Sequence, residues 1–207
     1  MFGVTHDVDE YLERMGWELE RVDWQAVARL AEGIWRAWED GQFIFVFGNG
    51  GSGATASHFA EDLAKNALRQ EDLHDASKRR PRVMSLTDNT PWITAIANDL
   101  GCEEIFLQQL MQYGRPGDVV IAISGSGNSP NVLAAVDWAN RQGLVTFGLT
   151  GYDGGKLKEI QQDGVHVVLD DMGMVESLHL TLLHWVVDDL HGRINAAGRY
   201  GAGMTNV

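Results

Sequence analysis

The sequence predicts an α/β protein, a three-layer sandwich with a five-stranded parallel sheet flanked by helices, plus additional N-terminal helices. Short apolar runs alternate with amphipathic stretches along most of the chain, and the first 40 residues have helical periodicity. Two of the apolar runs end in loops rich in Gly and Ser. Alternating strands and helices form right-handed βαβ units, so the strands should pair in parallel.

A single domain suits 207 residues of which 44% are hydrophobic. We expect an N-terminal helical segment over residues 1–40, an α/β core over 41–190 and a tail over 191–207. The N-terminal segment should hold two helices that divide near Arg21 to Trp24, because its apolar residues recur three or four apart. The tail is rich in Gly and Ala, and we expect it to be poorly ordered.

Each expected strand of the core is a short apolar run: 43–47, 82–86, 118–123, 144–149 and 165–169. Helices are expected over 54–68, 91–100 and 178–190, and after Ser129, which precedes Pro130 and could cap the helix. Ligands of such sheets bind at the carboxyl ends of the strands.

The composition excludes several classes of partner. A formal net charge of −13 argues against a nucleic acid or a membrane surface, and the basic cluster from Lys78 to Arg82 is interpreted as a solvated loop. The single Cys102 permits no internal disulfide, as in a reducing compartment. Neither a signal peptide nor a membrane span is apparent, so we expect a cytoplasmic protein.

The first Gly-rich loop, from Gly48 to Gly53 (GNGGSG), lies between a predicted strand and a predicted helix. Free backbone N–H groups at a helix N-terminus favour an anion there. The loop also matches G-x-G-x-x-G, but the polar segment from Arg69 to Arg80 cannot supply the second strand of a dinucleotide site. We therefore expect no nucleotide cofactor.

The second loop, from Ser124 to Ser129 (SGSGNS), offers three hydroxyls beside another helix N-terminus. This pattern suits a phosphate monoester without any Lys or Arg, although a Ser-rich turn that merely caps its helix would have the same sequence. No G-x-x-x-x-G-K-[ST] motif is present, so ATP or GTP chemistry is not indicated. Two such loops in one small sheet would surround one phosphorylated ligand.

These residues resemble the SIS (sugar isomerase) family. The likeness rests on Gly48 to Ser52, on Ser124 to Ser129 followed by Asn131-Val132-Leu133, and on Leu149-Thr150-Gly151 with Gly154-Gly155. Residues 58–63 (HFAEDL) and the spacing of Glu176, His179 and His184 further resemble the phosphoheptose isomerases. The resemblance runs from about residue 43 to 190 and implies the SIS fold.

The resemblance also implies a set of site residues. The sugar phosphate would be held by Gly50, Gly51, Ser52, Ser124, Gly125, Ser126 and Ser129, and sugar hydroxyls by Asn49 and Asp99. Zn²⁺ or another divalent ion would be bound by His58, Asp62, Glu176 and His184. Of these, Asp62 or Glu176 would act as the base and His184 as the proton shuttle.

The spacing of these four residues is compatible with such roles. His58 and Asp62 share one helix face, and Glu176 and His184 lie about 80° apart around a helix. On sequence alone, an ordinary surface pair is the favoured interpretation of His58 and Asp62, and a core histidine that of His184. The chain also departs from the family: Asp62 replaces Glu, Glu176 replaces Gln, Gly125 replaces Thr and Gly173 replaces Asp.

The function implied by the resemblance is ketose–aldose isomerisation of sedoheptulose 7-phosphate to a heptose 7-phosphate through an enediol, for bacterial surface polysaccharides. A homo-oligomer, a tetramer or a dimer, is implied as well. Two alternatives remain: isomerisation of another phosphosugar, and a non-catalytic SIS protein that binds a sugar phosphate or associates with a replication initiator. The four departures favour the non-catalytic alternative, and the retained His and carboxylate residues oppose it.

Overall fold

The computed structural model describes residues 2–201 and contains one five-stranded parallel sheet with the strand order β2-β1-β3-β4-β5. The strands are β1 (Phe43–Gly48), β2 (Arg82–Ser85), β3 (Val119–Ser124), β4 (Val145–Thr150) and β5 (Asp163–His166). Every neighbouring pair is parallel. The predicted fold class is therefore confirmed.

The strand order determines where a ligand can bind. After β1 the chain crosses to the outer strand β2 on one side, and β3 then returns to the other side of β1. The register pairs Gly48 with Ile123, so the carboxyl ends of β1 and β3 lie beside each other. In doubly wound sheets this change of direction opens the crevice in which ligands bind.

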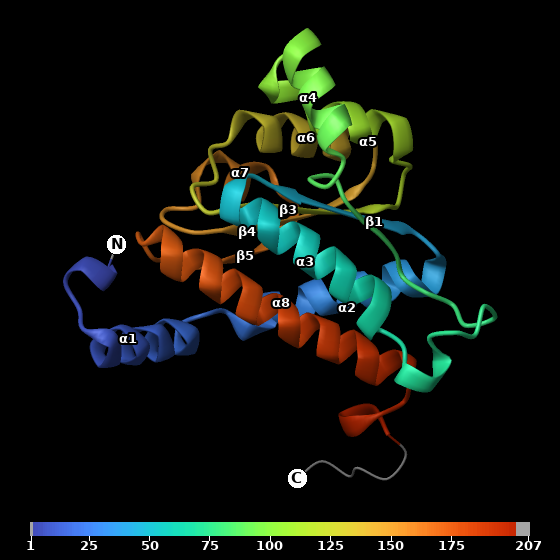
Figure 1. Cartoon of the computed structure of the whole chain (residues 1–207), viewed down its shortest axis with the longest axis horizontal. Helices are drawn as coiled ribbons and strands as arrows, with labels where there is room; N and C mark the ends of the chain where they lie inside the picture. Colours follow the sequence, from blue (N-terminus) through green and yellow to red (C-terminus); the bar gives the residue numbers. More distant parts are fainter. Residues whose placement is uncertain (1, 202–207) are drawn as a thin grey trace.

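Helices cover both faces of the sheet (Figure 1). One face carries α2 (Trp24–Asp40), α3 (Gly50–Asn66) and α8 (Met172–Ile194), and the other carries α5 (Leu107–Tyr113), α6 (Pro130–Arg141) and α7 (Gly155–Ile160). Successive β1 side chains alternate between the two cores, with Ile44 and Val46 in the first and Phe45 and Phe47 in the second. The sheet is therefore packed between two hydrophobic cores, one on each face.

The N-terminal segment forms the two predicted helices, α1 (Val8–Glu20) and α2. Asp7 caps α1 in a capping box with Glu10, and Asp23 caps α2 through the N–H groups of residues 25 and 26. The division at residues 21–23 therefore follows from the second cap. In Figure 1, α1 extends away from the sandwich.

The last helix differs most from the prediction. It begins at Met172 rather than at residue 178, because Asp171 accepts a hydrogen bond from Met174 N and caps it. It also continues to Ile194, and the described part of the predicted tail folds back through the 3₁₀ turn Gly198–Tyr200. Tyr200 there donates a hydrogen bond to the buried Asp189 over 2.6 Å. Residues 202–207 of the predicted tail lie outside the described residues.

Smaller differences concern the connections. Helix α4 (Thr90–Asp99) is close to its prediction, whereas α5, α7 and the 3₁₀ turns Phe2–Val4, Gln70–Asp72 and Cys102–Glu104 were not predicted. Strand β5 begins two residues earlier than expected, at Asp163, whose carboxylate forms an ion pair with Arg29 of α2. No helix in residues 2–201 is long and apolar enough to cross a membrane.

Candidate functional site

The two Gly/Ser loops meet at the carboxyl edge of the sheet. Asn49, at the end of β1, and Asn131, in the first turn of α6, exchange two side-chain hydrogen bonds of 2.9 Å. The side-chain oxygen Oδ1 of Asn131 also accepts a hydrogen bond from the backbone N–H of Val132 over 2.9 Å. Asn49 was predicted to contact sugar hydroxyls, but here its amide joins the two loops. The partner Asn131 was named only as part of the family resemblance and was given no role, because it is 82 residues away in the chain.

Both loops present donors for an anion. Ser52 is buried in the first turn of α3, and the Ser124 and Ser129 hydroxyls lie 3.3 Å apart. Ser126 Oγ accepts from Asn128 N over 3.3 Å. The N-cap side chains of α3 and α6 make no capping hydrogen bond, so backbone N–H groups at both helix starts remain available to a ligand. The predicted phosphate residues of both loops are thus brought to one edge.

Close packing fixes the second loop. Gly127 has a φ of 64°, and a side chain there would overlap the backbone of Gly154 in the loop after β4. Hydrogen bonds from Gly151 N to Gly125 O and from Leu157 N to Gly127 O, 2.8 and 2.9 Å, join the same two segments. A side chain at Gly125 would overlap Met172 Sδ. The glycine that replaces threonine here therefore leaves room for Met172.

Glu176 does not join the predicted metal residues. Its carboxylate lies over Gly51 in the first turn of α3, where any Cβ on Gly51 would overlap it. His184 follows eight residues later on α8, which is ~12 Å farther along the helix axis. The prediction that all four residues gather is therefore wrong for Glu176 in this structure. A carboxylate at a helix N-terminus is itself favoured by the helix dipole.

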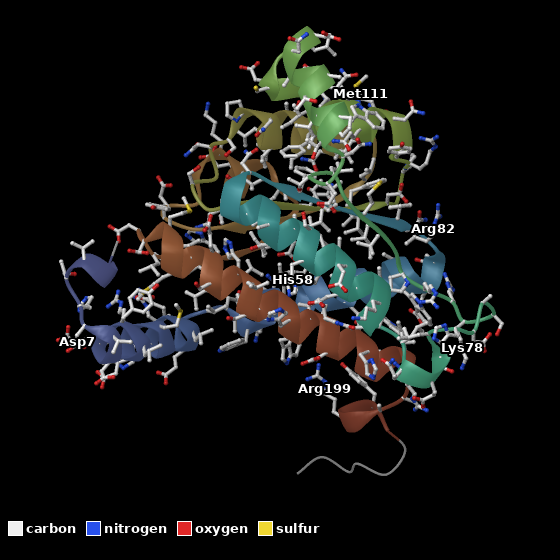
Figure 2. The ribbon with its side chains drawn as sticks, in the orientation of Figure 1. Asp7, His58, Lys78, Arg82, Met111 and Arg199 are labelled. Atoms are coloured by element: carbon white, nitrogen blue, oxygen red, sulfur yellow. The ribbon has the colours of Figure 1, made fainter. Side chains whose placement is uncertain are left out.

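His58, Asp62 and His184 do come together, where α3 and α8 pack side by side (Figures 1 and 2). The two imidazole Nε2 atoms are 3.0 Å apart, and Asp62 Oδ2 lies 3.3 Å from His58 Nε2 and 3.7 Å from His184 Nε2. Asp62 is buried, whereas both imidazoles are about half exposed. This group is accessible from solvent and has a fixed carboxylate.

The donor set of this group suits a divalent ion. One ligand atom from each of the three residues lies within 4.8 Å of the others, and two imidazoles with one carboxylate are a common zinc set that leaves a position for a further ligand. The Nε2 atoms of His58 and His184 are 3.0 Å apart, close enough for both to bind one ion. The residues present therefore fit a metal.

Asp99 makes no direct bond to the loops within the described residues. It ends α4, is exposed, and accepts a 2.7 Å hydrogen bond from the side chain of the neighbouring Asn98. Among the described residues, no hydrogen bond or ion pair joins it to either loop. The predicted contact of Asp99 with sugar hydroxyls stays a prediction.

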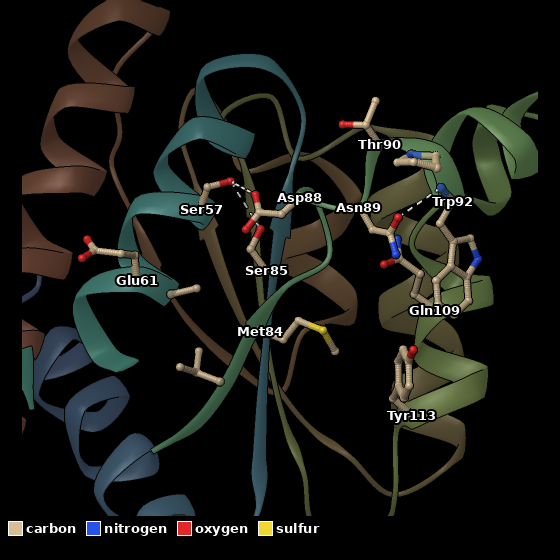
Figure 3. Close-up of a pocket in the computed structure, with 13 residues that line it drawn as sticks. Ser57, Glu61, Met84, Ser85, Asp88, Asn89, Thr90, Trp92, Gln109 and Tyr113 are labelled. Atoms are coloured by element: carbon tan, nitrogen blue, oxygen red, sulfur yellow. Dashed lines mark hydrogen bonds between the residues drawn. The ribbon is translucent and has the colours of Figure 1, made fainter. Parts of the chain in front are cut away.

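A cavity of about 590 Å³ lies between α3, β2 and α4 (Figure 3). Ser57 donates a hydrogen bond to Asp88 at one side, and Trp92 and Tyr113 pack edge to face at the other. Glu61 and Asp88 are its charged lining residues, and no Lys, Arg or His lines it. Such a wall disfavours a phosphate, so the loops remain the candidate anion site.

Two further histidines lie behind the site. His179 is fully buried, and burial lowers its pKa to about 4. Its Nε2 lies 3.2 Å from Thr150 O, and His166 Nδ1 lies 3.0 Å from the Thr150 hydroxyl. Burial lowers the pKa of His166 as well. Both side chains support the end of β4.

Comparisons with known proteins agree on one family. Residues 9–151 match the model of the SIS domain. A probable phosphoheptose isomerase from Thermoplasma acidophilum is 35% identical over 87% of this chain and 95% of its own, and a phosphoheptose isomerase from Geotalea daltonii is 36% identical over 91% and 93%. The structure of a phosphoheptose isomerase from Neisseria gonorrhoeae superposes with a TM-score of 0.77, at 30% identity over 89% of this chain and 92% of that one.

Proposed function

This chain belongs to the phosphoheptose isomerases of the SIS domain family, and we propose that it interconverts sedoheptulose 7-phosphate and a heptose 7-phosphate. It is an aldose–ketose isomerase. The observation that carries the assignment to this site is the pairing of two donor-rich loops at the sheet edge with a His58, Asp62 and His184 group on α3 and α8.

The loops are the proposed phosphate site. Ser52, Ser124, Ser126 and Ser129 would supply hydroxyls, and Gly50, Gly51 and Gly125 would supply backbone N–H groups. Two helix N-termini add their positive ends, which explains binding by loops that contain neither Lys nor Arg. The loops fix the phosphate end of the sugar and so orient its carbonyl end, and such positioning lowers the barrier of a proton transfer.

Asp62 is the proposed base. It takes a proton from C1 of the ketose, the C1–C2 double bond of the enediol forms, and the carbonyl oxygen at C2 gains a proton. Return of the proton to C2, with loss of the proton from the C1 hydroxyl as the C1 carbonyl forms, gives the aldose. His184 is placed next to Asp62 and has the half-exposed ring that a shuttle between the two oxygens needs. Glu176 lies too far along α8 to share this step in the described arrangement.

A divalent ion, zinc first, would be held by His58, Asp62 and His184. When bound, such an ion supplies Lewis-acid stabilisation of an oxygen that gains negative charge. Asp62 and His184 would then share metal binding with proton transfer.

We also propose a homo-oligomer, because α1 exposes a face that no described element covers. Tyr11, Met15 and Leu19 pack against the core, whereas Val8 and Leu12 are 70% and 61% exposed. A partner subunit would cover them. We also propose a cytoplasmic location, because the single Cys102 cannot form an internal disulfide, as is usual for proteins of a reducing compartment.

The assay is conversion of sedoheptulose 7-phosphate, with Asp62→Ala and His184→Ala compared with wild type. Each variant should lose about 10²- to 10⁴-fold in kcat while keeping its circular dichroism spectrum. His74→Ala, on the exposed loop after α3, is the matched control and should be fully active. Binding of the substrate without turnover in wild type would favour the non-catalytic alternative instead.

A further inference from the structure

Asn66 lies one helical turn beyond Asp62 on α3 and has not been given a role so far. Its side-chain Nδ2 donates a 2.8 Å hydrogen bond to Asp62 Oδ1. The direction is unambiguous, because an ionised carboxylate only accepts. The two oxygens of Asp62 are therefore distinguished: Oδ1 is occupied by Asn66, and Oδ2 faces both imidazoles.

The backbone of Asn66 is also fixed. Its carbonyl oxygen lies 2.7 Å from His191 Nδ1 on α8, and Asn195 Nδ2 donates to the next carbonyl, of Ala67, over 2.9 Å. These bonds anchor the end of α3 to the end of α8. His191 is two helical turns after His184 on the same helix. Asn66 thus contacts the carboxylate through its side chain and the helix of His184 through its main chain.

The hydrogen bond from Asn66 matters because the side chain of Asp62 is short. Asp has one methylene fewer than Glu, so Asp62 reaches the two imidazoles only if its plane is turned correctly. An amide hydrogen bond to Oδ1 limits rotation of the carboxylate and leaves Oδ2 as the single atom directed at His58 and His184. Neighbours that hydrogen-bond to ligating carboxylates orient them and tune the metal.

We propose that Asn66 is the positioning residue of the site, which holds Asp62 so that Oδ2 alone completes a divalent-ion site with His58 and His184. The inference rests on the metal site of the proposed function, but it concerns ion binding and not turnover. Asn66 itself is exposed, so its replacement leaves both cores intact.

The experiment measures Zn²⁺ affinity of chelator-treated protein by competition with a chromophoric chelator, together with the visible spectrum of the Co²⁺ form. Asn66→Ala should weaken Zn²⁺ binding about 10- to 100-fold and change the Co²⁺ spectrum. Asn66→Gln keeps an amide four residues from Asp62, and should restore most of the affinity. Lys65→Ala is the matched control, because Lys65 is the adjacent residue of the same turn and forms an ion pair with Glu61.

Wild-type affinity in Asn66→Ala would overturn the inference, as would equal losses in the Ala and Gln variants or the absence of Zn²⁺ and Co²⁺ binding by wild type. Far-UV circular dichroism verifies that each variant is folded. If the ion-binding pattern holds and sedoheptulose 7-phosphate is not converted, the proposed function fails while the role of Asn66 stands.

Discussion

The carboxylate of Glu176 lies directly over Gly51, at the start of the helix whose N-terminus is proposed to receive the substrate phosphate. A negative side chain therefore stands next to an anion site. Before substrate binds, the helix dipole favours this position for a carboxylate. When a phosphate enters, the two negative groups repel each other, so Glu176 must turn away or weaken binding.

Glu176→Gln should therefore lower KM for the sugar phosphate. Two unit charges about 4 Å apart in water interact by about 1 kcal/mol, which is roughly fivefold in KM, and the gain should shrink as salt rises. Steady-state kinetics at two ionic strengths measures it. Glu159→Gln, an exposed change of equal charge on α7, is the control. A collapse of kcat in Glu176→Gln would instead identify Glu176 as the base.

The amide pair between the loops gives a second prediction. Asn131→Ala removes both hydrogen bonds of the pair, and because Asn49 is exposed water can solvate its amide, so the free energy of unfolding should fall by about 0.5–1.5 kcal/mol per bond. Because the loops then move independently, KM should rise more than kcat falls. Urea denaturation and kinetics measure both effects, with Gln70→Ala as an exposed control. Unchanged stability would show that the pair does not join the loops.

Stability should fall in acid through His179. Burial depresses its folded pKa to about 4, below the ordinary value of 6.5. The unfolded chain therefore binds a proton near pH 6.5 that the folded chain refuses until about pH 4. The free energy of unfolding should drop by about 1.4 kcal/mol per pH unit in this window, and remain level above it.

The measurement is urea denaturation between pH 4.5 and 7.5 for wild type and for His179→Gln, which cannot take up the proton. The difference between the two curves isolates His179 from the carboxylates that titrate in the same range. Parallel curves would mean that folding does not lower the pKa of His179.

The exposed face of α1 gives a prediction about assembly. Leu12→Asp places a charge where a partner subunit is proposed to pack, and should reduce the molar mass found by light scattering after size exclusion. The helix itself should persist, because Leu12 is exposed rather than part of the core. Glu13→Lys, next to it, changes the charge without removing apolar area. An unaltered mass in Leu12→Asp would place the interface elsewhere.

The fold could be predicted from the sequence because its signals are local. Apolar runs of five or six residues identify β1 and β3, and the Gly/Ser loops follow directly. The last helix was predicted too short, because Gly173 interrupts its apolar pattern and hides the cap at Asp171. Local signals of this kind predict that a helix or strand is present more reliably than they predict its first and last residues.

The site was predictable in part for a related reason. His58 and Asp62 share one helix, so their spacing alone predicts a pair. The position of Glu176 depends on how α8 packs against α3, and the bond between Asn49 and Asn131 depends on which strands are neighbours. Such relationships arise from tertiary packing, which spacing along the chain does not contain.

The alignment of α3 with α8 has a consequence for biosynthesis. Both helices run in the same direction, so Gly51 meets Glu176, His58 meets His184, and the end of α3 meets His191. The reacting groups thus join the first helix of the core to the last. During translation these groups can assemble only after α8, which ends at Ile194, has left the ribosome, so activity should not emerge before that point.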